Sequence, residues 1–165
     1  MDKKQMEDHE EATKIKTIHQ IELGGQISDT WYYAPFPREY HSDILYICDF
    51  CLNSFLEKIQ KEKHIEICNL WHPPGDMIYK DDDVAMFEVD GFMHWMYCEN
   101  LCLFSKLFLD HKTLRYDCSP FRYYVLCEPR SGGNSEFSFH IVGYFSKEKG
   151  IVENNLSCIL VLPSS

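Results

Sequence analysis

The stretch with the strongest signal reads CDFCLNSFLEKIQKEKHIEIC over residues 48–68, and it holds Cys48, Cys51, His64 and Cys68. Zinc takes four ligands tetrahedrally, and a Cys-x2-Cys gap lets one tight turn supply two of them. A His-x3-Cys pair spans one helical turn, so both side chains can face the same ion from the end of a helix. The spacing predicts a closed, structural C2HC zinc finger at about residues 45–70, with coincidental core cysteines as the alternative.

The regions on either side of the finger suggest helix and strand. Leu52, Phe55, Leu56 and Ile59 have helical spacing and lead into the His-Cys pair. Residues 15–23 carry three β-branched isoleucines before a Gly-Gly pair, which favours a strand over a short helix. Residues 1–14 are almost entirely polar and charged, so we expect a disordered, solvated tail.

The remainder of the chain predicts a mixed α/β (α+β) fold with antiparallel strands. Residues 84–89 and 92–97 flank Asp90-Gly91, which is typical of a two-residue hairpin turn. An apolar stripe predicts a helix over residues 100–110. Short loops separate three further expected strands, at residues 121–128, 139–146 and 156–162, and short connections favour an antiparallel meander.

Composition limits the possible partners. The 165 residues carry 16 basic and 26 acidic side chains, a formal net charge of −10, which disfavours direct DNA binding and favours a basic partner. The finger itself has lysines interleaved with glutamates and no basic stripe. No window approaches the ~18 apolar residues of a membrane span, and the start has no apolar core of signal-peptide type. We therefore expect a protein of a reducing compartment, without membrane contact, whose eight cysteines stay free of disulfides.

Several longer motifs closely resemble the MYST family of histone acetyltransferases, over about residues 15–163. Besides the finger, they are WYYAPFP (31–37), HPPGD (72–76), YCENLCL (97–103), KLFLDHKTL (106–114), HIVGYFSKEK (140–149) and NLSCILVLP (155–163). The resemblance identifies the chain with the N-terminal and central part of that family's catalytic domain. It implies a zinc-finger region followed by a core shared with other acetyl-CoA-dependent N-acetyltransferases, here truncated at its C-terminus within residues 15–165.

The same resemblance implies a function and assigns site residues. The activity would be transfer of acetyl from acetyl-CoA to lysine side chains of histone tails, in the nucleus and within chromatin complexes. The zinc ligands fall on the four finger residues already named, the family's autoacetylated lysine on Lys112, and its active-site cysteine on Cys158. Ile159, Leu160 and Val161 correspond to the strand whose backbone contacts acetyl-CoA. From the residues alone, Lys112 is better read as a surface lysine near a helix end, and Cys158 as a small hydrophobe of a strand.

The family pattern continues beyond Pro163 with a phosphate-binding turn at a helix N-terminus and a glutamate base, neither of which these 165 residues contain. A lysine ammonium is not a nucleophile near neutral pH until a base takes its proton. Near Cys158 only His140 and Glu153 come into question as bases. We therefore expect little or no acetyl transfer by these residues alone. The alternatives are a non-catalytic zinc-finger interaction module derived from the family and, more weakly, a stand-alone finger of a nucleic-acid regulator.

Overall fold

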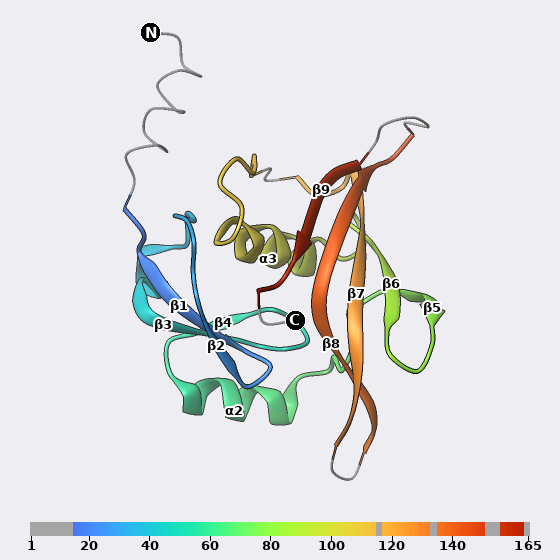
Figure 1. Cartoon of the computed structure of the whole chain (residues 1–165), viewed down its shortest axis with the longest axis horizontal. Helices are drawn as coiled ribbons and strands as arrows, with labels where there is room; N and C mark the ends of the chain where they lie inside the picture. Colours follow the sequence, from blue (N-terminus) through green and yellow to red (C-terminus); the bar gives the residue numbers. More distant parts are fainter. Residues whose placement is uncertain (1–14, 115–116, 133–134, 151–155, 164–165) are drawn as a thin grey trace, which may run out of the picture.

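The computed structural model describes residues 15–114, 117–132, 135–150 and 156–163, which form two β-sheets with two α-helices (Figure 1). The tail expected at residues 1–14 lies outside this part of the chain. The fold is mixed α+β, as predicted.

The smaller sheet forms the first half of the molecule. Its order is β2 (Gln26–Asp29), β1 (Ile18–Leu23), β3 (Ser42–Ile47) and β4 (Ser54–Phe55). β1 and β3 run parallel, joined by a connection that contains the 3-10 helix η1 (Arg38–Tyr40), and the outer pairs are antiparallel. The strand expected within residues 15–23 is confirmed over Ile18–Leu23. Gly24 and Gly25 have φ of 61° and 81°, which suits the two-residue turn into β2.

The helix expected to begin near Leu52 begins later, as α2 (Lys58–Ile67). Leu52 has a left-handed φ of 63°, and Phe55 belongs to β4 and pairs with Tyr46 of β3. The helix starts after Glu57, whose side chain and that of Gln60 form a reciprocal capping box. The helical spacing of Leu52 and Phe55 was misleading about where the helix begins. These residues lie in the tight turn that brings Cys48 and Cys51 together and in the short strand after it.

The larger sheet is antiparallel throughout. Its order is β5 (Asp76–Lys80), β6 (Ala85–Asp90), β7 (Phe121–Gly132), β8 (Ser135–Glu148) and β9 (Leu156–Val161). β7, β8 and β9 pair in sequence order, which confirms the meander predicted for the C-terminal third. Among the described residues β9 is the last strand of this sheet, so its outer edge pairs with no other described strand.

The hairpin predicted around Asp90-Gly91 is wrong. Its first strand is β6, but β6 pairs with β5 and β7, and residues 91–94 form turns that lead into a helix. The Asp90 carboxylate accepts backbone N–H bonds from Phe92 (2.8 Å) and Met93 (3.2 Å), and the Asp90 carbonyl accepts one from His94 (2.9 Å). An aspartate that accepts the amides two and three residues later winds the chain forward instead of folding it back.

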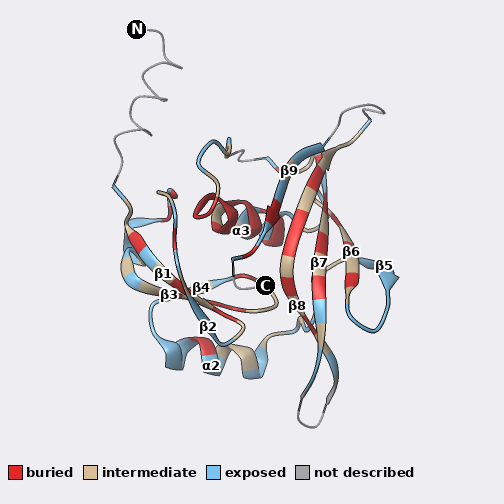
Figure 2. Cartoon of the chain, viewed as in Figure 1, coloured by how far each residue is buried: buried red, intermediate tan, exposed pale blue. Residues whose placement is uncertain are grey.

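The helix that follows, α3 (Trp95–Lys106), begins five residues before the predicted start and ends four before the predicted end. It lies between the two sheets and is largely buried (Figures 1 and 2). Its inner residues join both sheets in one apolar core, together with Leu45 and Val125. Among the described residues, no helix has the length and apolar character needed to cross a membrane.

Candidate functional site

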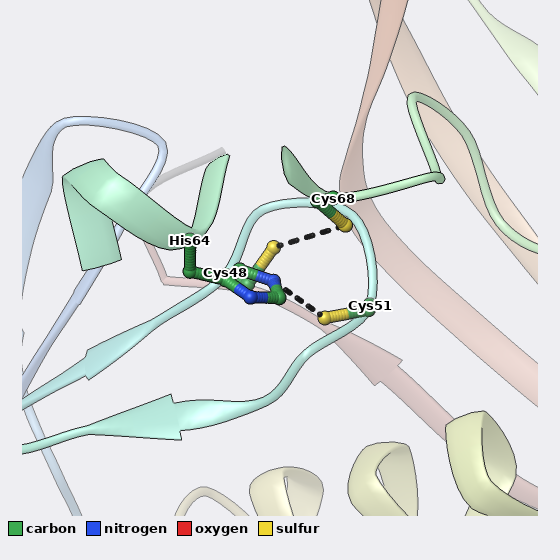
Figure 3. A group of neighbouring side chains, drawn as sticks. All are labelled: Cys48, Cys51, His64 and Cys68. Carbon is green, nitrogen blue, oxygen red and sulfur yellow. Dashed lines mark hydrogen bonds between the residues drawn. The ribbon is translucent and has the colours of Figure 1, made fainter. Parts of the chain in front are cut away.

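The four predicted zinc ligands lie together in the smaller half of the molecule (Figure 3). Cys48 follows β3, Cys51 lies in the turn before β4, His64 belongs to α2, and Cys68 caps the C-terminal end of that helix. The turn is closed by hydrogen bonds from the Cys48 N–H to the Asn53 carbonyl and from the Leu52 N–H to the Cys48 carbonyl.

The donor atoms have the spacing that a tetrahedral ion requires. All four ligand atoms lie within 4.8 Å of one another, with 4.0 Å between Cys48 Sγ and Cys68 Sγ and 3.2 Å between Cys51 Sγ and His64 Nε2. Two sulfurs bound tetrahedrally to zinc at ~2.3 Å would be about 3.8 Å apart. A hydrogen bond from Cys51 lowers the pKa of Cys48 to about 5. Three thiols and an imidazole in this arrangement fit a structural zinc ion.

A buried ion network fixes the turn that carries the two cysteines. The Lys61 ammonium of α2 lies 3.0 Å from Asp49 and 2.8 Å from Glu22 of β1. The Asp49 carboxylate also accepts the Gly24 N–H at 2.8 Å. Asp49 stands between the first two predicted ligands, so these contacts bind their turn to both α2 and β1.

A second candidate site is a cavity of about 430 Å³ formed where α3 and the segment after it face the larger sheet. Both Lys112 and Cys158 line it, although they are far apart in sequence. Cys102 of α3, Tyr123 of β7 and Ser146 of β8 line it too. The volume is within the range of small-molecule sites, about 300–1,000 Å³.

The cysteine of this cavity is held in β9 against β8. Cys158 pairs with Ser146, and its sulfur lies 3.3 Å from the hydroxyl of Tyr144. That hydroxyl in turn donates to Ser105 Oγ of α3 at 2.8 Å. Burial raises the pKa of Tyr144 well above its usual value, so its phenol is protonated at neutral pH.

The three residues after Cys158 are placed differently from one another. Ile159 lines the cavity and has an exposed side chain, Leu160 is buried in the core, and Val161 is exposed. The alternation is that of a strand with one face packed. Because β9 is the edge strand of the described sheet, alternate backbone groups along it face away from β8 and pair with no other described strand.

Neither base considered from the sequence is placed beside Cys158 by the structure. His140 lies near the zinc cluster, with its ring 5.2 Å from Phe50 and its Nδ1 3.7 Å from Asp49, and burial lowers its pKa. It lies six positions along β8 from Ser146, about 20 Å away at the rise of a strand. Glu153 lies outside the described residues.

Sequence reasoning did not identify several residues around the cavity. There the Cys102 Sγ lies 3.5 Å from the Tyr123 hydroxyl oxygen. A hydrogen bond from Cys118 lowers the pKa of Cys102 to about 6. His111 also lines the cavity. Alternation along β7 and β8 could have marked Tyr123 and Tyr144 as inward-facing polar side chains, which usually need a partner.

Comparison with known proteins gives matches for both the region of the candidate zinc ligands and the region of the cavity. Residues 15–68 match the MYST family zinc finger domain, and residues 72–165 match the MOZ/SAS family. The first match contains the four clustered ligands and the second contains the cavity residues. Together with the cluster geometry, the finger match supports a structural zinc ion.

Curated relatives extend across almost the whole chain. Identity is 52% to the putative MYST-like histone acetyltransferase 1 of rice and 51% to the histone acetyltransferase of the MYST family 2 of Arabidopsis thaliana, each over 99% of this chain and 36% of the relative. It is 49% to the histone acetyltransferase Tip60 homolog of Caenorhabditis elegans, over 92% of this chain and 32% of the relative. The chain thus spans about a third of the length of these relatives. By its finger, its core and these relatives, the chain belongs to the MYST (MOZ/SAS) family of histone acetyltransferases.

Proposed function

We propose that these residues form the N-terminal and central part of a lysine acetyltransferase domain, which transfers acetyl from acetyl-CoA to histone lysines. The observation that carries the proposal is the cavity that both Lys112 and Cys158 line. The family resemblance assigns autoacetylation to Lys112 and the active-site cysteine to Cys158. The two residues come from separate parts of the chain and line the same cavity.

Each site residue has a proposed role. Cys158 is the cysteine next to the reacting thioester, and Lys112 is the residue that becomes acetylated. The backbone of Ile159, Leu160 and Val161 hydrogen-bonds acetyl-CoA along the outer edge of β9. The rationale is physical as well as by resemblance, because an edge strand offers unpaired N–H and C=O groups to an extended ligand.

Zinc has a structural role in this proposal, with Cys48, Cys51, His64 and Cys68 as its ligands. The ion would join the end of β3 to α2. Its contribution is to folding, because all four tetrahedral positions are filled by protein atoms.

The proposed acceptor is a basic histone tail, and the proposed location is the nucleus, in complexes with other chromatin proteins. The formal net charge of −10 favours a basic peptide by long-range attraction. The relatives carry names that describe those proteins as histone acetyltransferases. Direct contact with DNA is disfavoured by the same charge.

Acetyl-CoA binding tests the cavity. Thr113 is exposed and lines it, so Thr113→Trp places an indole in the cavity without disturbing the core. Titration calorimetry with acetyl-CoA should show binding by the 165-residue polypeptide and at least about tenfold weaker binding by this variant. Ser131→Trp, at an exposed position of β7 outside the cavity lining, is the matched control and should bind as the unmodified chain does. Equal affinity of both variants would place the ligand elsewhere.

Acetyl transfer to a histone-tail peptide tests the activity of these residues alone. We expect little or no transfer, because the family's phosphate-binding turn and glutamate base correspond to no residue of this sequence. Turnover comparable to that of a full-length relative would contradict this. Absence of both transfer and acetyl-CoA binding, with retained capture of a nuclear partner that Cys48→Ala abolishes, would favour the interaction module instead.

A further inference from the structure

A line of hydrogen bonds runs from Cys158 into the core. Cys158 Sγ lies 3.3 Å from Tyr144 Oη, Tyr144 Oη lies 2.8 Å from Ser105 Oγ, and Ser105 Oγ lies 2.9 Å from the main-chain carbonyl of Cys102. Tyr144 is 3% exposed and Ser105 is fully buried, so both hydroxyls depend on these protein partners. The line joins three elements, β9, β8 and α3.

The far end of the line determines the direction of every bond in it. A carbonyl oxygen can only accept, so Ser105 donates its one hydroxyl hydrogen to Cys102 and can only accept from Tyr144. Tyr144 likewise has one hydroxyl hydrogen, and it is used on Ser105. Toward Cys158 the Tyr144 oxygen is therefore an acceptor, and the hydrogen between them belongs to the sulfur.

We propose that Tyr144 and Ser105 are positioning residues that hold Cys158 as a neutral thiol whose S–H donates to Tyr144 Oη. Ser105 acts at a distance here, by orienting the tyrosine hydrogen away from the sulfur. A thiolate, by contrast, would need Tyr144 to turn its hydrogen toward Cys158, which leaves Ser105 Oγ without its donor in a buried site.

This arrangement bears on acetyl transfer, and that part of the inference rests on the proposed function. The thiolate and not the thiol is the nucleophilic form of cysteine. Cys158 therefore stands in the cavity wall as an oriented hydrogen-bond donor. Forming its thiolate needs a base that takes the proton from the sulfur, in addition to rotation of the Tyr144 hydroxyl toward that sulfur.

Alkylation of Cys158 by iodoacetamide, followed by peptide mass spectrometry, tests the direction of the line without any acetyl-CoA. The rate at neutral pH is divided by the rate at alkaline pH, so that changes in access to the sulfur cancel. In Ser105→Ala the tyrosine loses its acceptor and turns to the sulfur. The ratio should rise on the order of tenfold, because hydrogen bonds to charged groups are the strong ones.

Tyr144→Phe removes the hydroxyl and should leave the ratio no lower than in the unmodified chain. The opposite pattern, a roughly tenfold lower ratio in Tyr144→Phe and no change in Ser105→Ala, would show that the tyrosine already donates to the sulfur, and would overturn the proposal. Ser105→Thr keeps a hydroxyl and should behave as the unmodified chain. Tyr123→Phe is the matched control, since Tyr123 lies against Cys102 in the same cavity.

Infrared spectroscopy covers the case in which a core variant does not fold. The difference spectrum between the unmodified chain and Cys158→Ala should contain an S–H stretch at lowered frequency, the signature of a donating thiol. Absence of that band would overturn the proposal. A chain that binds no acetyl-CoA but gives the expected alkylation pattern would refute the proposed function while leaving the hydrogen-bond line intact.

Discussion

At the scale of single residues, the molecule depends on polar groups that are buried with partners. Lys61 is only 4% exposed, yet its ammonium lies between the carboxylates of Glu22 and Asp49. Nothing in the spacing of the α2 lysines distinguishes Lys61 from Lys58, which is exposed and 3.9 Å from Glu62. Lys61 is buried and paired, and Lys58 is exposed, only because α2 packs one of its faces on β1 and on the turn that carries the two cysteines.

Replacing Lys61 tests that difference. Lys61→Met leaves two largely buried carboxylates without their cation and should lower the free energy of unfolding by about 3–5 kcal/mol. Lys58→Met removes an exposed helix pair and should cost no more than about 0.5 kcal/mol. Urea unfolding of both zinc-loaded variants measures the two values. Equal effects would contradict the role given to the buried network.

At the scale of elements, one carboxylate decides whether the chain turns back as a hairpin or winds into α3. Asp90 is the last residue of β6, and its contacts with Phe92, Met93 and Lys149 hold the turn before the helix. Although partial burial alone would raise the pKa of Asp90, the bonds from Lys149 and the two amides lower it overall. An Asp-Gly pair after a strand is therefore ambiguous until the bonds of the carboxylate are known.

The lowered pKa gives this element a pH-dependent contribution to stability. A carboxyl group whose pKa is lowered by folding stabilises the fold above its unfolded value, and that contribution is lost as the pH falls through the folded value. Asp90→Asn should thus lower the free energy of unfolding by about 1 kcal/mol at neutral pH, discounted for partial exposure. The difference from the unmodified chain should disappear in acid. A constant difference in urea unfolding at both pH values would contradict this.

At the scale of the whole molecule, two sheets share one core around α3, and each side carries one candidate site. The cluster of candidate zinc ligands lies where β3 ends against α2, and the cavity lies between α3 and the larger sheet. Ser105 and Lys106 show how closely α3 ties the halves together. Ser105 accepts from Tyr144 of β8, and the Lys106 ammonium donates to the Tyr33 carbonyl in the segment after β2.

Zinc content is the measurement at this scale. We expect one zinc ion per chain by elemental analysis, and its loss in Cys68→Ser together with a fall of about 3 kcal/mol or more in the free energy of unfolding. Cys158→Ser changes a cysteine outside the cluster and should retain the metal. A full complement of zinc in Cys68→Ser would remove that residue from the ligand set.

The features that the sequence determined by itself are those set by local spacing or by neighbouring segments. The candidate finger ligands come from two short pairs, Cys48 with Cys51 and His64 with Cys68, the meander strands from neighbouring segments, and the family from short motifs in a fixed order along the chain. These features depend on local patterns: a tight turn, the helical repeat, or the two-residue alternation of side chains along a strand. Tertiary structure alone decided the rest. The Lys149 contact of Asp90, the burial of Lys61 and the shared cavity of Lys112 and Cys158 depend on groups from distant segments, which no local pattern contains. The direction of the hydrogen bonds at Cys158 is the clearest case, because it is determined by a carbonyl of α3 to which neither β8 nor β9 contributes.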